Sequence, residues 1–289
     1  MDTVTPTPKP PLRDRLAATW AQASCLRRQA RQTMNKNGGR HRLTLLLAYA
    51  VATMVAAGLY VFSSGVYTLI RLLIDLDINA QILLGKLTDL LFALLCLFLL
   101  LPLLSGVWRL ACLMTAPPKE ETREHTVTTP RPTLFQLFYP FTSPRAYGRS
   151  MAVGLESLGW GLAAVVVPCL VYVNVRPLLT VPSAPQWLVT ALFLLPCILW
   201  GLGVFFVSGK RSGFGYFVFL NESMPLRDAD CIFRSFRRPL LAVLLWRLPL
   251  LGWAVISILT VLIPLLPHTL PYSACCAAAY AHYLESPKD

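Results

Sequence analysis

Apolar residues in this chain gather into blocks of about twenty, and this grouping limits the possible folds more than any other feature. A helix needs about 20 consecutive apolar residues to cross the ~30 Å hydrocarbon core of a bilayer. Charged residues make up only 14% of the chain, whereas a soluble domain carries nearer ~25%. No polar stretch between the blocks is long enough for an ordinary soluble domain. The sequence therefore predicts an all-α fold, a polytopic bundle of transmembrane helices.

The apolar blocks predict about six spans. Their ranges are 43–62, 87–110, 151–173, 187–207, 240–266 and 272–284. The apolar but charge-bearing stretch 66–78 is interpreted as an interfacial or re-entrant helix between the first two spans. The spans form one transmembrane domain, 43–284, which follows a basic segment, 1–42, and precedes a short tail, 285–289.

The net charge of +12 is distributed unevenly along the chain. Most of the 26 lysines and arginines lie in 1–42 and in the loops 115–150 and 210–238, which share one side of a six-span arrangement. The predicted outer segments hold only three, Arg71, Lys86 and Arg176. Because Lys and Arg concentrate on the cytoplasmic side of a membrane, both termini are expected to be cytoplasmic. No nucleic-acid-binding signature accompanies these charges, so no nucleic-acid partner is expected.

The basic segment 1–42 contains an amphipathic pattern. Its apolar residues recur at spacings of three and four, at Leu12, Leu16, Trp20, Ala23, Leu26, Ala30 and Met34. This spacing predicts a helix with one apolar face and one basic face. We interpret it as a surface helix that rests on anionic lipid. The alternative is a docking helix for a partner protein.

An aromatic stretch lies in the loop 115–150 and is too short to span a bilayer. Its aromatic residues are Phe135, Phe138, Tyr139 and Phe141. Aromatic side chains concentrate at membrane–water interfaces, so these residues are expected to be interface anchors.

Glu156 and Arg247 are charged residues that lie more than one turn from either end of their predicted spans. Charged side chains in lipid are costly and are functional-site candidates by default. Arg247 is roughly 10 Å from the basic end of its span and could extend its side chain to that surface. It could also pair with Glu156, or help to bind a substrate or ion. The glycine-rich, cationic turn 209–215 is either an anion-binding nest or an ordinary basic turn.

Several kinds of chemistry find no support in the sequence. Of the eight cysteines none forms a C-x-x-C pair and most lie in apolar blocks, so neither a disulfide framework nor a zinc site is expected. The four histidines are scattered, and no hydrolase motif is present. We therefore expect no metal, no cofactor and no enzymatic activity.

The last predicted helix is short and built from small residues. About thirteen residues at ~1.5 Å each reach only about 20 Å, so packing would have to hold it in place. Small residues let helix backbones approach closely. Cys275, Cys276, Ala278 and Ala279 are therefore expected to press against a neighbouring span, most simply the fifth.

The C-terminal third resembles a known family through short motifs. These are Ser235-Phe236, the stretch 248–253 (LPLLGW), Pro271-Tyr272, Ala279-Tyr280 and Tyr283. Gly106 and the stretch 134–141 resemble the middle of the same family. The family is one of uncharacterised bacterial integral membrane proteins catalogued as domain of unknown function 975. The resemblance implies a polytopic helical fold in a bacterial plasma membrane, and it implies no activity.

The leading functional hypothesis is a non-enzymatic membrane component that binds a partner or a lipid through its basic inner face. The alternative is a small transporter or transporter subunit. A transporter needs a polar cavity near the middle of the bilayer. The predicted spans offer few polar residues to line one, and this favours the first hypothesis.

Overall fold

The computed structural model describes residues 12–35, 39–74, 77–116, 132–177, 185–236, 238–252 and 266–285. Within these ranges every regular element is helical and no strand occurs. The prediction of an all-α helical bundle is confirmed.

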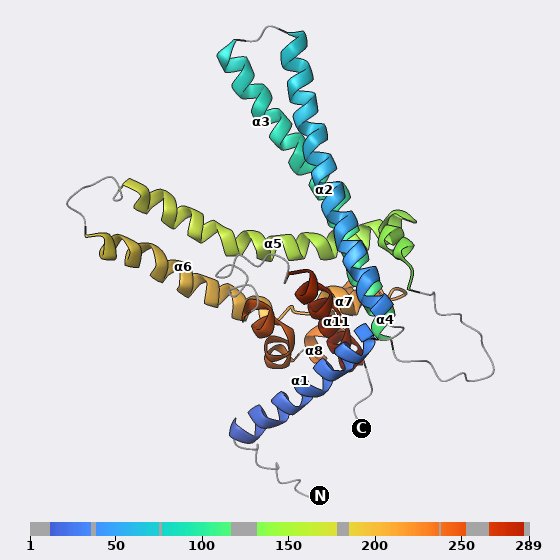
Figure 1. Ribbon diagram of the computed structural model, residues 1–289. Helices are drawn as coiled ribbons and strands as arrows, with labels where there is room; N and C mark the ends of the chain where they lie inside the picture. The colour runs from blue at the N-terminus through green and yellow to red at the C-terminus, as the bar shows by residue number, and fades with distance from the viewer. Residues whose placement is uncertain are drawn as a thin grey trace, which may run out of the picture.

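Two long helical hairpins dominate the architecture. The first pairs α2 (Arg40–Leu73) with α3 (Ile78–Leu95), which continues through a π-helical turn, η2 (Cys96–Leu100), into α4 (Leu101–Thr115). The second pairs α5 (Pro144–Val175) with α6 (Gln186–Gly209). Figure 1 shows the two hairpins leaving a packed body in different directions.

Four of the described helices are long and apolar enough to cross a membrane. They are Arg40–Leu73, Ile78–Thr115, Pro144–Val175 and Trp187–Leu220. Their large apolar side chains are widely exposed, for example Leu72 at 79% and Val173 at 66%. Soluble proteins rarely expose contiguous apolar surface on this scale, whereas lipid-facing helices do so throughout their spans. These helices fit an integral membrane protein.

The expectation of a separate interfacial helix over 66–78 is wrong. α2 continues without a break to Leu73 and is 34 residues long. The chain turns only after Ile74, whose backbone N–H still donates to the Ile70 oxygen at 3.0 Å. Asp77 is the N-cap of α3, and its carboxylate accepts from the Ala80 N–H at 3.0 Å. Arg71 did not end the helix, because a charged side chain can lie on an exposed face without interrupting backbone hydrogen bonds.

The last two predicted spans differ from their expected ranges. The described part of 240–266 is a short apolar helix, Pro239–Gly252, which contains α9 (Pro239–Ala242) and a π-helical segment, η5 (Val243–Arg247). Residues 253–265 lie outside the described part of the chain. The last helix, α11 (Leu266–Glu285), has 20 residues and begins earlier than predicted. The prediction began after Pro271, since proline disfavours a helix interior, but the structure buries Pro271 inside α11.

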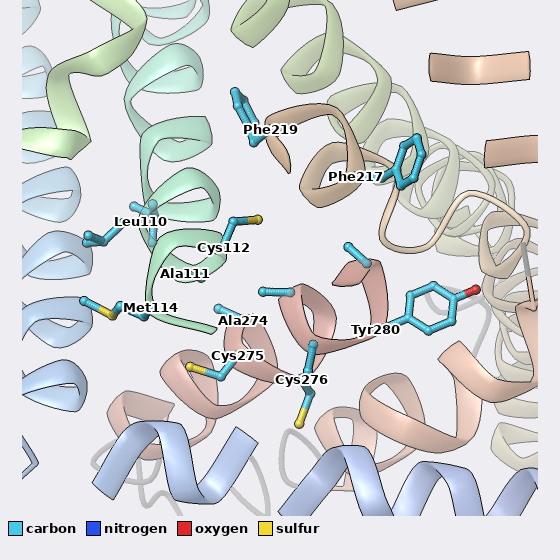
Figure 2. Close-up of a cluster of buried hydrophobic side chains, with 14 of the residues drawn as sticks. Leu110, Ala111, Cys112, Met114, Phe217, Phe219, Ala274, Cys275, Cys276 and Tyr280 are labelled. Atoms are coloured by element: carbon cyan, nitrogen blue, oxygen red, sulfur yellow. The ribbon is translucent and has the colours of Figure 1, made fainter. Parts of the chain in front are cut away.

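The core surrounds α4, near the crossing of the two hairpins (Figure 1). It combines α4 and α11 with α7 (Phe214–Leu220), α8 (Leu226–Phe236) and the C-terminal half of α1 (Leu12–Asn35). Figure 2 shows side chains of α4, α7 and α11 converging there, including Cys112, Phe217 and Cys275. This core joins helices that are far apart in the sequence.

The small residues of α11 lie deep in this core. Cys275, Cys276 and Ala278 are 0% exposed, and Ala279 is 1% exposed. The neighbours of α11 are mainly α4 and α1, and the segment from the predicted fifth span contributes less. α11 does contact η5, which belongs to the predicted fifth span, but it is enclosed by several helices because it has small residues on every side.

Only part of the apolar stripe of α1 is available to lipid or to a partner. Ala23, Leu26 and Ala30 are buried in the protein's own core. The N-terminal half of α1 extends away from the body (Figure 1), and there Trp20 is 53% exposed. The C-terminal half of the apolar face of α1 is thus an internal packing surface, and only the N-terminal half is exposed.

Candidate functional site

A cavity of about 320 Å³ lies where the turn after α6 meets α5 and η5. Three tryptophans line it, Trp108, Trp160 and Trp246. Its charged lining residues are Glu156, Arg211 and Arg247. The cavity therefore contains both charges that the sequence placed inside spans, together with part of the glycine-rich turn.

Glu156 pairs with Arg211 rather than with Arg247. Arg211 Nε donates to Glu156 Oε1 at 2.5 Å, and its Nη2 donates to Oε2 at 3.2 Å. Arg211 also pairs with Asp230, which accepts from Arg234 at 2.7 Å. Among the described residues no ion pair joins Glu156 to Arg247. The pairing considered from the sequence is therefore replaced by a cluster that links α5, the turn after α6, and α8.

Arg247 binds the C-terminal end of α6. Its Nη1 donates to the Phe205 oxygen at 2.6 Å and to Ser208 Oγ at 2.8 Å, and its Nη2 donates to the Ser208 oxygen at 3.0 Å. The last carbonyl groups of a helix lack intrahelical partners, and a cation there also complements the helix dipole. Arg247 thus fixes the end of α6 beside the cavity.

The glycine-rich turn is tightly enclosed. Gly213 has a φ of +85°, and a Cβ there would lie 2.8 Å from Cδ1 of Tyr280. Glycine is therefore required at this position, both for its backbone conformation and because a side chain would clash with Tyr280.

Three amides of this turn are already used within the protein. The N–H groups of Arg211, Ser212 and Phe214 donate to the carbonyl oxygens of Ser208, Gly209 and Arg211. These three amides are therefore not available to an anion, and the side chains of the turn are the better candidates for ligand donors.

Two buried side-chain groups in the cavity lining have no hydrogen-bond partner, Ser212 Oγ and Trp246 Nε1. A buried polar group without a partner costs about 1–3 kcal/mol. Together with Arg247 they place three kinds of donor, a hydroxyl, an indole N–H and a guanidinium, around one cavity. This arrangement is typical of a site for an anion.

An apolar groove of about 440 Å³ continues from the cavity. The groove and the cavity share four lining residues, Trp160, Ser208, Trp246 and Arg247. Farther along, the groove is lined by apolar residues and glycines of α5, α6 and the helix Pro239–Gly252. A Cβ added at Gly161 or Gly201 would meet nothing within 4 Å, so the groove is open at both glycines. The site is thus polar at one end and apolar at the other.

The charges of the cavity lining do not balance. Arg211 and Arg247 oppose the single carboxylate of Glu156, while Asp230 lies outside the lining and is shared with Arg234. Burial raises the pKa of Asp230, but hydrogen bonds and charges from Arg211 and Arg234 outweigh it and hold the pKa below its ordinary value. Asp230 is therefore a carboxylate at neutral pH. The cavity keeps one positive charge in excess.

A second buried polar network stabilises the turn between α7 and α8. Arg109 Nε donates to Glu222 Oε1 at 2.5 Å, and the Tyr139 hydroxyl donates to Glu222 Oε2 at 3.0 Å. Arg149 donates to the backbone oxygens of Asn221 and Met224 at 3.0 and 2.6 Å. Neither Arg109 nor Arg149 lines the cavity, so this network stabilises the fold beside the candidate site.

The predicted interface anchors belong to a 3-10 helix, η3 (Leu134–Phe141). Phe135, Phe138 and Phe141 are exposed, with Phe135 at 84%. Tyr139 is different, since the Arg109 guanidinium lies over its ring, 3.6 Å from the centroid. Tyr139 is therefore part of the internal polar network and is not an interface anchor.

Sequence reasoning missed Ser212 and Trp246 as site residues. Trp246 precedes the unusual Arg247, and Ser212 lies in the glycine-rich turn, so both were next to residues that had been singled out. The described part of the chain contains no cluster of three His, Cys, Asp or Glu side chains that could hold a metal ion.

The chain matches no family model, no curated protein and no solved structure. The resemblance to the uncharacterised bacterial membrane protein family accordingly stays a prediction.

Proposed function

We propose that this integral membrane protein is a non-enzymatic component that binds one anionic phospholipid of the surrounding bilayer in the cavity and groove described above. The observation that carries the proposal is the junction of an apolar groove with a cationic cavity that contains unpartnered donors. The phosphate would accept hydrogen bonds from Arg247, Ser212 and Trp246, and the acyl chains would lie along the groove.

Each part of the ligand has a physical reason to bind. Arginine donors match phosphate oxygens well, and hydrogen bonds to charged groups are the stronger ones. A methylene group that leaves water contributes about 0.8 kcal/mol. An acyl chain that moves into the groove from the bilayer leaves an apolar environment instead, so it gains only van der Waals contacts with the groove. Charge, rather than apolar area, should therefore select the ligand. The single excess positive charge favours a headgroup with one negative charge.

The position of the cavity supports a binding component over a transporter. Ser208 and Gly209 are the last residues of α6, so the cavity lies at a helix end. Transporter sites lie near the middle of the bilayer, between broken helices. Under the N-in arrangement inferred from the basic loops, the cavity would face the cytoplasmic leaflet, where anionic lipids collect.

The test is lipid retention by the purified full-length protein in a neutral maltoside detergent, measured by native mass spectrometry. Phosphatidylglycerol should be retained in preference to phosphatidylcholine. Gly201→Leu fills the groove and should weaken phosphatidylglycerol retention by about tenfold, equivalent to ~1.4 kcal/mol.

Gly203→Leu is the matched control. A Cβ at Gly203 also meets nothing within 4 Å, but Gly203 does not line the groove. Retention should be unchanged in this variant. Equal retention of the two lipids by the parent protein, or equal losses in the two variants, would contradict the proposal.

A further inference from the structure

A second recess, of about 260 Å³, lies between α2 and α3. Six hydroxyl-bearing residues line it, namely Tyr60, Ser63, Ser64, Tyr67, Thr68 and Thr88. Tyr49 of α2 lines the cavity at the end of α6, and Ser63 is roughly 21 Å farther along the same helix, at ~1.5 Å per residue. The recess is therefore remote from the cavity at the end of α6 and independent of the function proposed for it.

The residues of the recess form one face on each helix. On α2 they follow the spacing i, i+3, i+4, i+7 and i+8 from Tyr60, and on α3 Gly85, Thr88, Asp89 and Phe92 follow i, i+3, i+4 and i+7. Residues at these spacings share a helix face. Polar residues inside apolar helices are costly and mark functional sites. Two facing polar stripes in one hairpin therefore indicate a site.

Three of the six hydroxyl groups of the recess donate to backbone oxygens of their own helices. Ser63 Oγ donates to the Tyr60 oxygen at 3.0 Å, Thr68 Oγ1 to the Ser64 oxygen at 2.9 Å, and Thr88 Oγ1 to the Gly85 oxygen at 2.8 Å. Because these protons are used within the helices, the oxygen lone pairs remain for another group.

Asp89 adds a carboxylate to the same lining. A wall of acceptors with one negative charge suits a ligand that donates hydrogen bonds and carries one positive charge. Lys86 and Arg71 are on the same two helices but do not line the recess.

The recess favours an organic cation over a metal ion. Its volume of about 260 Å³ is several times the ~30 Å³ of a water molecule. Three aromatic rings, those of Tyr60, Tyr67 and Phe92, also line it, and aromatic faces attract cations. The rings of Tyr60 and Phe92 pack edge to face, with their centroids 5.8 Å apart. We propose that the recess between α2 and α3 binds a small organic molecule through a primary ammonium group.

The ammonium would donate to Asp89 and to the hydroxyl oxygens of Thr88 and Ser63, and the apolar part of the ligand would contact the aromatic rings. The probe is benzylammonium chloride, with benzyl alcohol as its neutral counterpart. Isothermal titration calorimetry of the full-length protein in a neutral detergent should show benzylammonium binding at least about tenfold more tightly than benzyl alcohol. Equal affinity for the two probes would overturn the proposal.

Two pairs of variants assign the binding to this recess. Asp89→Asn should weaken benzylammonium binding by about tenfold, since it removes a charged acceptor. Asp77→Asn makes the same change at the start of α3, where asparagine caps as well as aspartate, and should leave the affinity unchanged. Thr88→Val should also weaken binding, while Thr53→Val, at an exposed threonine on α2 outside the recess, should not. Unchanged affinity in both Asp89→Asn and Thr88→Val would refute the assignment, even if Asp89→Asn lowered protein stability.

Discussion

The guanidinium of Arg247 holds the carbonyl of Ser208, with Nη2 3.0 Å from its oxygen. Together with the hydrogen bonds from Nη1 to the Phe205 oxygen and to Ser208 Oγ, this contact joins the helix Pro239–Gly252 to the end of α6 beside the candidate lipid site. Because the same arginine lines both the cavity and the groove, its position decides whether the polar and apolar parts of the site meet. The charged side chain of Arg247, which would be costly in lipid, therefore holds two helices together and also lines the candidate ligand site.

Arg247→Leu should lower stability. The substitution removes the hydrogen bonds from Arg247 to the Phe205 and Ser208 carbonyl oxygens and to the Ser208 hydroxyl, and losing such hydrogen bonds costs about 1–3 kcal/mol. Thermal melting in detergent measures the loss. Arg176→Leu, at the exposed C-cap of α5, removes an arginine from the far end of the same hairpin and should have little effect. A melting temperature unchanged by Arg247→Leu would show that Arg247 extends to the surface instead.

A double-mutant cycle should locate the partner of Glu156. Glu156→Gln and Arg211→Gln should show a coupling of about 0.5–3 kcal/mol, because the two side chains share two hydrogen bonds. Glu156→Gln and Arg247→Gln should be additive within about 0.5 kcal/mol. The free energy of unfolding of each variant in detergent provides the measurement. Coupling only in the second cycle would contradict the structure.

Stability should depend on pH through Asp230. Its pKa is held below the ordinary value, since Arg211 and Arg234 outweigh the effect of burial. A depressed folded-state pKa gives a contribution that is complete above the ordinary value of ~3.9 and is lost as pH falls through the folded-state pKa. From about pH 5 to about pH 3, the melting temperature of the parent should therefore fall more steeply than that of Asp230→Asn. The exposed Asp228→Asn, on the same helix, should keep the steep dependence of the parent.

Much of the helical framework could be predicted from the sequence, because the length and polarity of an apolar block are local properties. The blocks at 43–62, 87–110, 151–173 and 187–207 all lie within helices that the structure describes. Helix ends were less predictable. α2 continues well beyond the expected end of its span, because nothing in the backbone chemistry stops a helix at the membrane surface.

The site was only partly predictable. Glu156 and Arg247 stood out because charges are rare in spans, and the structure places both in one cavity. The partner of Glu156 did not stand out. Arg211 lies in the turn after α6 and reaches Glu156 because α6 packs against α5, a tertiary contact that the local sequence does not specify. The recess between α2 and α3 was readable as two polar stripes, but their alignment depends on the register of the hairpin.

Gly106 should tolerate no side chain. A Cβ there would overlap the carbonyl group of Leu137, because η3 crosses α4 at that point. Gly106→Ala should therefore lower stability by about 1–3 kcal/mol or more, the usual cost of overpacking. Gly58→Ala is the matched change on α2, where a Cβ meets nothing within 4 Å, and should stabilise the protein by up to about 1 kcal/mol. Melting curves of both variants measured side by side should move in opposite directions.

The small residues of α11 should be equally sensitive to added volume. Ala278 is fully buried and Ala279 nearly so, and α11 contacts mainly α4 and α1. Ala279→Leu should push these helices apart and lower stability by about 1–3 kcal/mol. Ala191→Leu, the same substitution at an exposed position on α6, should change the melting temperature very little. If the Ala279→Leu variant had the same melting temperature as the parent protein, α11 could not lie in the core. In that case the contacts that join the two hairpins to α1 would need another explanation.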